Sequence, residues 1–158
     1  MPTIADRIAQ LGIVLPPPTP PHEPLDAVVV HAGTARTSGQ LPRADGALQA
    51  IGRLGDQLTV EEGTAAARLC ALNALAVLEV ALGSLDAIDR VLHVTGFVAC
   101  VPDFDQQPAV IDGASQVLAD VFGPAGRHTR SAIGVAALPR GAAVEIEVTV
   151  AVRSPPRT

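Results

Sequence analysis

The stretch RSAIGVAALPRGAAVEIEVTVAV, residues 130–152, decides how the chain folds, because it places very few charges among apolar residues. In its second half, valines and one isoleucine alternate with Glu145, Glu147 and Thr149. This period of two predicts a strand with one apolar and one polar face. The residues that follow Arg130 also have strand character, and PRGA at 139–142 provides a turn. The stretch therefore predicts a β-hairpin.

Three further segments towards the N-terminus predict strands. Valine-rich or β-branched runs are bounded there by glycine and proline, the residues that punctuate strands. Residues 26–42 predict a hairpin that turns at AGT, residues 46–55 predict a third strand, and residues 89–100 predict a fourth segment of strand.

Two long helices are predicted between these strands. Residues 59–83 begin with Thr59 and Glu62 in capping-box spacing and end at Gly83. This segment is almost continuously apolar, but Arg68, Asn73 and Glu79 interrupt it, so it predicts a buried helix and not a membrane span. Residues 108–122 predict the second helix, with proline near its first turn and glycine after its end.

The resulting order is β-β-β-α-β-α-β-β, an α+β fold with a mixed sheet of about six strands and two helices on one face. Apolar residues make up 48% of the chain and charged residues only 17%, below the usual share of about 25%. The uncovered sheet face still carries valines and alanines. We therefore expect the subunits of a homo-oligomer to pack against that face.

The first 23 residues differ in composition from the body at 24–152 and from the tail at 153–158. Residues 3–12 predict a short helix, with Thr3 and Asp6 in capping-box spacing. Five prolines between residues 16 and 21 then predict an extended, stiff segment. Such a segment spaces the helix from the body or lies across a neighbour. A ligand for a proline-binding domain is an alternative.

Charge and composition exclude several classes of partner and site. The net charge of −5 argues against nucleic-acid or anionic-membrane partners, which require a basic patch. The N-terminus lacks a signal-peptide pattern, and Cys70 and Cys100 lie in apolar runs, as expected of reduced thiols in a cytoplasmic protein. The four histidines lack the spacing of a metal site. We therefore predict no metal and no membrane association.

Arg130 and Glu145 are the two charged residues whose placement among apolar residues most needs an explanation. A solvated strand face is the plain interpretation of both glutamates. In a hairpin that turns near Arg140, Glu145 is opposite Ala136, which is roughly 20 Å from Arg130 at about 3.3 Å per residue. If the two charges act together, they do so across a subunit boundary or an opened sheet.

Two motifs, TSGQLP at 37–42 and RSAIGVAALPRGAAVEIEV at 130–148, resemble the Rid (YjgF) superfamily of reactive-intermediate deaminases, also labelled endoribonuclease L-PSP. The resemblance covers about residues 24–152. It implies a chorismate-mutase-like α+β fold and a homotrimer with ligand clefts between subunits. It implies neither a metal nor an organic cofactor.

The resemblance also implies roles for individual residues. Arg130 matches the arginine that binds a substrate carboxylate with two hydrogen bonds, which suits its planar fork. The backbone amide at Ala132 contacts the same carboxylate, and Glu145 matches the glutamate that orients the attacking water. Ser38 and Gly39 match the small residues of the cleft wall.

Some positions depart from the family pattern. Leu25 stands where the family has a tyrosine, and the usual asparagine at the start of the second helix has Ser115 or Asp112 in its neighbourhood. The loop before Arg130 adds Arg127 and His128, which enlarge a basic pocket; an exposed loop histidine is the alternative for His128.

Two functions follow from this pattern. The first is a cofactor-free enzyme that hydrolyses reactive 2-imino acids, with Arg130 holding the carboxylate and Glu145 positioning water. The second is a trimeric binding protein or sensor that holds a small carboxylate without turnover. Arg130 and Glu145 favour the enzyme, whereas Leu25 and the missing asparagine favour the binding protein.

Overall fold

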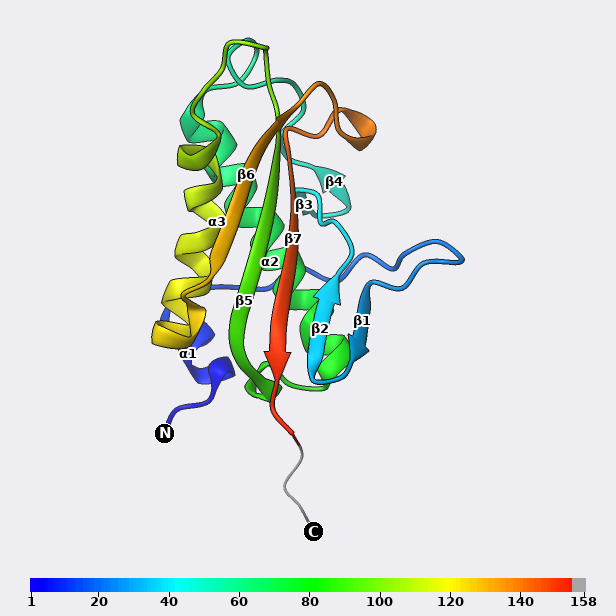
Figure 1. Cartoon of the computed structure of the whole chain (residues 1–158), viewed down its shortest axis with the longest axis vertical. Coiled ribbons are helices and arrows are strands. Elements are labelled where there is room, and N and C mark those ends of the chain that lie inside the picture. The colour runs from blue at the N-terminus through cyan, green and yellow to red at the C-terminus, as the bar shows by residue number, and fades with distance from the viewer. Residues whose placement is uncertain (155–158) are drawn as a thin grey trace.

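A five-stranded mixed sheet with the order β1-β2-β7-β5-β6 forms the centre of the protein (Figure 1). The computed structural model describes residues 1–154. The strands of this sheet are β1 (Val28–His31), β2 (Thr34–Thr37), β5 (Ile88–Ala99), β6 (Thr129–Val135) and β7 (Val144–Val152). Only β5 and β6 are parallel to each other, and all other neighbours are antiparallel.

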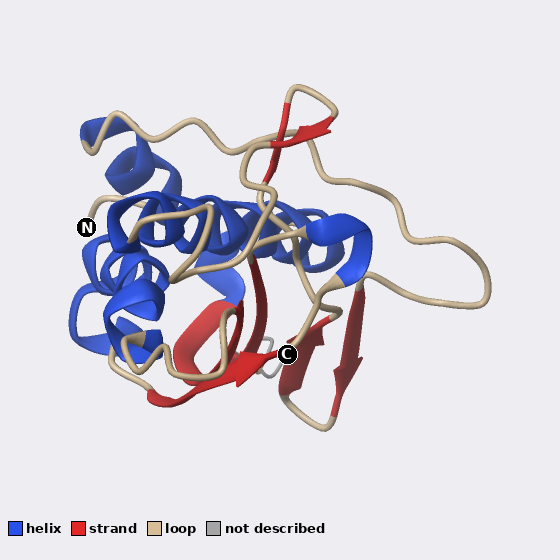
Figure 2. Ribbon diagram, turned by 90° about the horizontal axis from the view of Figure 1, so that it is seen from above, coloured by secondary structure: helices blue, strands red, loops and turns tan. Residues whose placement is uncertain are grey.

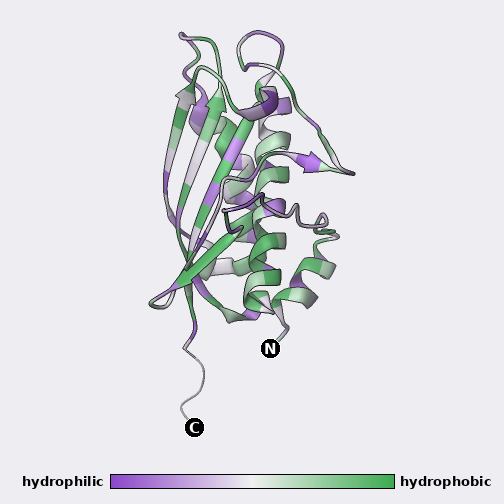
Figure 3. Ribbon diagram, turned by 90° about the vertical axis from the view of Figure 1, so that its right-hand side faces the viewer, coloured by the Kyte–Doolittle hydropathy of each residue, from purple (hydrophilic) through white to green (hydrophobic). Residues whose placement is uncertain are grey.

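The two long helices, α2 (Val60–Leu82) and α3 (Gln107–Phe122), cover one face of this sheet (Figure 2). The other face, which we call the open face, has no helix of residues 1–154 over it. Helix α2 carries hydrophobic residues along most of its length (Figure 3), and α3 buries Val110, Ile111, Val117 and Leu118. The α+β fold class and the two helices on one face are therefore as predicted.

Local signals explain the position of α2. Thr59 and Glu62 form the predicted capping box, and Gly83 ends the helix in a left-handed conformation with φ of 77°. The helix is long and apolar enough to cross a membrane, but 61% of its most apolar window is buried inside the fold. It is accordingly a core helix, which packs on β7 of the sheet and lies beside α3.

Helix α3 approaches β5 closely because one strand position has no side chain. A Cβ at Gly96 would lie 2.5 Å from the Ile111 side chain of α3. The connection from β5 through α3 to β6 is a β-α-β unit, which makes β5 and β6 parallel. This unit positions residues of α3 beside the edge strand β6.

The predicted hairpin over 130–152 is wrong, because β5 lies between its two strands. Strand β6 pairs with one edge of β5, and β7 pairs with the other. Eight residues, 136–143, connect β6 to β7 and include the short turn η3 (Pro139–Gly141). This connection is long enough to pass over the end of β5, whereas a tight hairpin turn would have forced direct pairing.

The third strand predicted at 46–55 does not join the main sheet, which therefore has five strands and not about six. Instead β3 (Arg43–Ala44) and β4 (Ala47–Leu48) form a separate two-stranded ribbon. Beyond it the chain makes only isolated bridges, including one between Ile51 and Ala142. Glycines at 46, 52 and 55, all with positive φ, prevent a continuous strand here.

The N-terminal helix α1 (Ile4–Gln10) packs on the body of its own chain. Thr3 and Asp6 form the predicted capping box. Ile8 and Ile13 belong to the hydrophobic core, and the Arg7 side chain donates to the Asp120 carbonyl at 2.9 Å. From α1 the chain crosses behind the helices to the proline-rich segment, which loops out beside β1 (Figure 1). The division at residues 23 and 24 stays a prediction, and residues 155–158 lie outside the described part of the tail.

Candidate functional site

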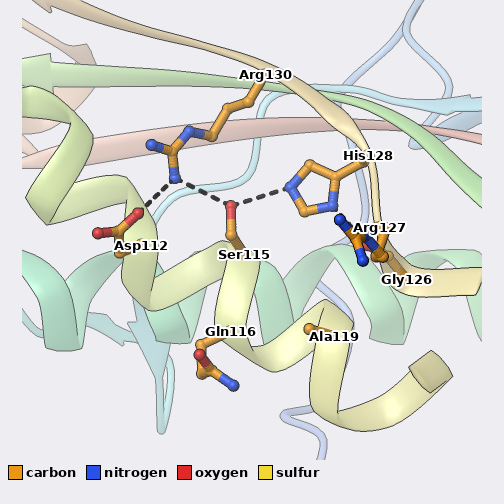
Figure 4. Close-up of a pocket in the computed structure, with 8 residues that line it drawn as sticks. All are labelled: Asp112, Ser115, Gln116, Ala119, Gly126, Arg127, His128 and Arg130. Atoms are coloured by element: carbon orange, nitrogen blue, oxygen red, sulfur yellow. Dashed lines mark hydrogen bonds and ion pairs between the residues drawn. The ribbon is translucent and has the colours of Figure 1, made fainter. Parts of the chain in front are cut away.

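Arg130 lies on the edge strand β6 with its side chain directed at helix α3. Its Nη1 donates to Asp112 Oδ1 at 2.8 Å and to Ser115 Oγ at 3.1 Å (Figure 4). The side chain of Arg130 is 22% exposed, whereas that of Asp112 is 68% exposed. The arginine is thus held at the sheet edge by two residues one helical turn apart.

His128 extends this hydrogen-bonded group in a defined direction. Its Nδ1 lies 2.6 Å from the Gly126 carbonyl oxygen, which can only accept, so Nδ1 carries the proton. In the neutral ring Nε2 is then an acceptor, and it receives the Ser115 hydroxyl at 2.9 Å. Ser115 therefore donates to His128 and accepts from Arg130. Ser115 and His128 thus lie beside Arg130, and their role in ligand binding stays a prediction.

These residues line an open cavity of about 350 Å³ at the sheet edge. Because Nη1 of Arg130 is used by Asp112 and Ser115, the Nε and Nη2 side of the guanidinium remains for a ligand. Nη2 has one further contact, a 3.4 Å hydrogen bond to the Pro108 carbonyl. Nε and Nη2 together form the fork that a carboxylate accepts with both oxygens.

Ala132 follows Arg130 on the helix-facing side of β6 and offers its backbone at the free sheet edge. Val135 directs its carbonyl towards β5, where it accepts from the Cys100 amide at 3.1 Å. Backbone groups of successive strand residues point to opposite sides, so the amide of Ala132 points away from β5. An unpaired amide two residues beyond Arg130 is a suitable second donor for an anion.

Glu145 lies on β7, with its side chain on the open face and away from the Arg130 cavity. It lines a larger cavity of about 690 Å³, together with Ser38, Gly39 and Leu25. Gly39 lies so close that a Cβ there would be 1.8 Å from Glu145 Oε1. Ser38 donates to the Asp26 carbonyl at 2.7 Å, which fixes this wall of the cavity.

The environment of Glu145 disfavours its charge. Burial raises the pKa of the Glu145 carboxyl, and the nearby Glu147 carboxylate raises this pKa further. Glu147 has its own partner, since Arg36 Nη2 donates to it at 2.9 Å. Glu145 has no hydrogen-bond partner or ion pair among the described residues. It is therefore the less compensated of the two carboxylates.

The predicted site residues thus form two groups on opposite faces of one sheet. Arg130, Ser115, His128 and the Ala132 amide lie at the helix-facing edge, and Glu145, Ser38 and Gly39 lie on the open face. In the strand register Arg130 is level with Val148, three residues along β7 from Glu145 and two strands away. Within one chain these two groups do not face the same ligand.

Two features of the site were not predicted from the sequence. Asp112 is the ion-pair partner of Arg130. The sequence placed Asp112 only near the position of the family asparagine and did not predict this ion pair. Residues 19–22 of the proline-rich segment line the Glu145 cavity, as does Arg140 of η3. The dense prolines were the sequence signal for residues 19–22, because they predict a stiff, extended segment.

Neither metal nor thiol chemistry has a group of residues to support it in the described chain. No cluster of three or more histidine, cysteine, aspartate or glutamate residues within 1–154 could hold a metal ion. Both cysteines are buried, and burial raises the pKa of the Cys70 thiol, so the protonated form is favoured.

Comparisons with known proteins agree with this architecture. Residues 7–147 match the YjgF/chorismate mutase-like family, which is described as a family of candidate endoribonucleases. Protein TCP17 of Trypanosoma cruzi is 43% identical over 148 residues, covering 93% of this chain and 92% of that protein.

Solved structures share the fold over nearly the whole chain. Atu1372 from Agrobacterium tumefaciens, whose function is unknown, is 40% identical with a TM-score of 0.89, covering 95% of this chain and 92% of its own. A protein of Shewanella oneidensis, described as a candidate endoribonuclease, is 31% identical with a TM-score of 0.92, covering 96% and 100%. TdcF of E. coli, solved with bound serine, is 26% identical with a TM-score of 0.59, covering 89% and 94%.

Proposed function

Because this chain belongs to the YjgF/chorismate mutase-like family, we propose that it hydrolyses reactive 2-imino acids in clefts between the subunits of a homotrimer. The observation that carries the proposal is the separation of Arg130 and Glu145 on opposite faces of one sheet. Each lines a cavity of its own, and each cavity holds only half of the expected groups. A second subunit can supply the missing half.

The Arg130 half binds the carboxylate of the ligand. The Nε and Nη2 atoms of Arg130 donate to the two carboxylate oxygens, and the Ala132 amide adds a third donor at the sheet edge. Ser115 and Asp112 hold the guanidinium in place from α3. A pre-oriented arginine loses little conformational freedom on binding, which favours affinity. In TdcF, the bound serine is a small molecule with such a carboxylate.

The Glu145 half, contributed by a neighbouring subunit, acts on the reacting carbon. Water adds to the imine carbon through its oxygen, and the carboxylate of Glu145 accepts the proton that the water releases. The nitrogen takes up the proton held by Glu145, and the new hydroxyl group gives up its own proton to the nitrogen as the carbon–nitrogen bond breaks, so that ammonia leaves and a 2-oxo acid remains. The pKa of Glu145, raised by burial and by Glu147, makes its carboxylate a stronger base than an exposed glutamate.

A non-catalytic binding protein for small carboxylates is the alternative, and Leu25 favours it. Leu25 lines the Glu145 cavity at the position where the family tyrosine is expected, and it offers no hydroxyl to the reaction. In that case the Arg130 half alone would account for ligand binding. For either function we propose the cytoplasm, where Cys70 and Cys100 stay reduced.

Mixing two inactive variants tests the shared cleft. The Arg130→Ala and Glu145→Gln chains are co-expressed so that they form mixed trimers. The rate at which the mixed trimers hydrolyse freshly generated 2-iminobutyrate is compared with the rate of each variant alone. If one cleft takes Arg130 and Glu145 from different chains, about a quarter of the clefts in randomly mixed trimers are intact, and activity returns. If both residues act from one chain, no mixed assembly restores activity, and the shared cleft is wrong.

Light scattering provides the matched measurement of assembly. A homotrimer has a mass of about 48 kDa, three times the chain mass of 16.1 kDa. A mass of 16 kDa at micromolar concentration would remove the shared cleft. Binding of 2-oxobutanoate without any 2-iminobutyrate hydrolysis above the spontaneous rate would support the binding protein instead.

A further inference from the structure

Basic side chains continue beyond Arg130 along the start of β6. Arg127 lines the Arg130 cavity, and it also lines an adjoining cavity of about 400 Å³ together with Arg90 and His128. The two cavities share Arg127 and His128, so they form one groove, which we call the basic groove. Asp112 is the one acidic residue among the described residues that line it. On a chain with a net charge of −5, this groove is a local reversal of sign.

The charges of this groove are unequally compensated. Asp112 already pairs with Arg130 at 2.8 Å. Arg90 and Arg127 form no ion pair with any residue of 1–154. Arg90 nevertheless lies beside Arg127, because its Nη2 donates to the Arg127 backbone carbonyl at 3.1 Å. Both arginines line the same cavity and neither is paired with a carboxylate of the described chain, so an anion bound in this cavity would be attracted by both positive charges.

His128 does not provide a donor to such an anion. Its protonated Nδ1 is used by the Gly126 carbonyl, and its Nε2 accepts the Ser115 hydroxyl. The ring therefore acts as a fixed spacer between the two arginine positions. Any second anionic group in the groove must therefore be recognised by Arg127 and Arg90. These two arginines line the part of the groove at the N-terminal end of β6.

From this arrangement we infer that the ligand carries two anionic groups, the first on Arg130 and the second on Arg127 and Arg90. The ligand class is a 2-imino or 2-oxo acid whose side chain ends in a carboxylate or a phosphate. The inference rests on the proposed function only for the first carboxylate on Arg130. Arginine suits both kinds of second group, because its fork binds carboxylate and phosphate oxygens alike.

Calorimetry on the full chain with stable 2-oxo acids tests the inference. The probes are 2-oxobutanoate with one carboxylate, 2-oxoglutarate with two, and 3-phosphohydroxypyruvate with a terminal phosphate. We expect at least one dianion to bind about 2- to 5-fold more tightly than 2-oxobutanoate, the range of an exposed ion pair. The preferred dianion identifies the second group.

Substitution of Arg127 then assigns the effect to the groove. In Arg127→Ala the dianion should lose its advantage over 2-oxobutanoate. Arg68→Ala, an exposed arginine on α2 outside the groove, should leave every affinity unchanged. An equal affinity of all three probes, or an advantage that persists in an Arg90→Ala/Arg127→Ala variant, would overturn the inference.

The same titrations separate this inference from the proposed function. If Arg130→Ala binds 2-oxobutanoate as tightly as the unchanged protein, the proposed carboxylate site fails. If Arg130→Ala abolishes that binding and the three probes bind the unchanged protein equally, the carboxylate site stands and only the second anionic group is wrong.

Discussion

Arg130 and Glu145 project from opposite faces of the same sheet. Arg130 is level with Val94 and Val148, whose side chains are fully buried on the helix-facing side. Glu145 is level with Phe97 and Ile133 on the open face. Since paired residues on neighbouring strands share a face, no rotamer of either side chain brings the two charges together within one chain. The predictions below treat them as two separable half-sites.

Arg130→Ala should leave the fold intact and abolish carboxylate binding. The side chain lies at a sheet edge and supports no core residue, but it supplies the charge and the fork on which binding depends. We expect a loss of roughly 2–5 kcal/mol in the binding free energy of 2-oxobutanoate, measured by calorimetry. Arg130→Lys should recover only part of this loss, because an ammonium group cannot bind both oxygens in one plane. Unchanged affinity in Arg130→Ala would make the arginine structural.

Ser115 should act as a positioning residue for that arginine. Ser115→Ala removes the acceptor for Arg130 Nη1 and the donor to His128 Nε2. We expect the affinity for 2-oxobutanoate to fall by about 0.5–1.5 kcal/mol, the usual contribution of one hydrogen bond. Ser115→Thr keeps the hydroxyl and should retain most of the affinity. If both substitutions weaken binding equally, the loss reflects packing and not the hydrogen bond.

Glu145→Gln should stabilise the protein at neutral pH. The folded-state pKa of Glu145 lies above its unfolded value, because burial and Glu147 both disfavour the charge. The stability associated with a neutral Glu145 is therefore present below the unfolded pKa and is lost as pH rises through the folded pKa. The variant should unfold at higher denaturant than the unchanged protein at pH 7 to 8. This advantage should shrink as the pH falls through the folded-state pKa, and it should be absent below about 4.3, the ordinary pKa of glutamate.

Denaturant titrations at fixed protein concentration and several pH values provide the measurement. Glu147→Gln is the matched control, and it should lack this gain because Glu147 is already paired with Arg36. A stability difference between Glu145→Gln and the unchanged protein that does not vary with pH would contradict the raised pKa.

The helices and the first hairpin could be predicted because their signals are local. Thr59 with Glu62, and Thr3 with Asp6, are each three residues apart, and both capping boxes form as expected. The turn between β1 and β2 needs only Ala32 and Gly33, both of which have positive φ. Such signals depend on the nearest neighbours in the chain and hold whatever the rest of the fold does.

The order of the strands could not be predicted in the same way. The alternation of 144–152 specifies a strand and its faces, but it does not specify which neighbour pairs with it. A β-α-β crossover brings β6 beside β5, and this non-local event separates β6 from β7. It also brings Ser115 of α3 under Arg130, so the composition of the site depends on the same event. The resemblance to a known family provided these residues, whereas local patterns alone would not have.

The close contact between Gly39 and Glu145 gives the last prediction. A Cβ at position 39 would lie 1.8 Å from Glu145 Oε1 and 2.7 Å from its Cδ, so Gly39→Ala must displace the carboxylate. The clashing atoms are the flexible end of a side chain, and the backbone can stay where it is. We therefore expect a small change in the free energy of unfolding, within about 1 kcal/mol, and retained binding of 2-oxobutanoate at Arg130.

Turnover of 2-iminobutyrate by Gly39→Ala should instead fall markedly, because water is no longer held by a correctly placed carboxylate. A double-mutant cycle with Glu145→Gln decides whether the displacement of Glu145 is the cause. If it is, Gly39→Ala slows the unchanged protein but adds little to the loss already present in Glu145→Gln, since neighbouring residues that act through one group are not additive. Fully additive losses would show that Gly39 affects the ligand directly, and the small residue would then be a wall of the cleft independent of the glutamate.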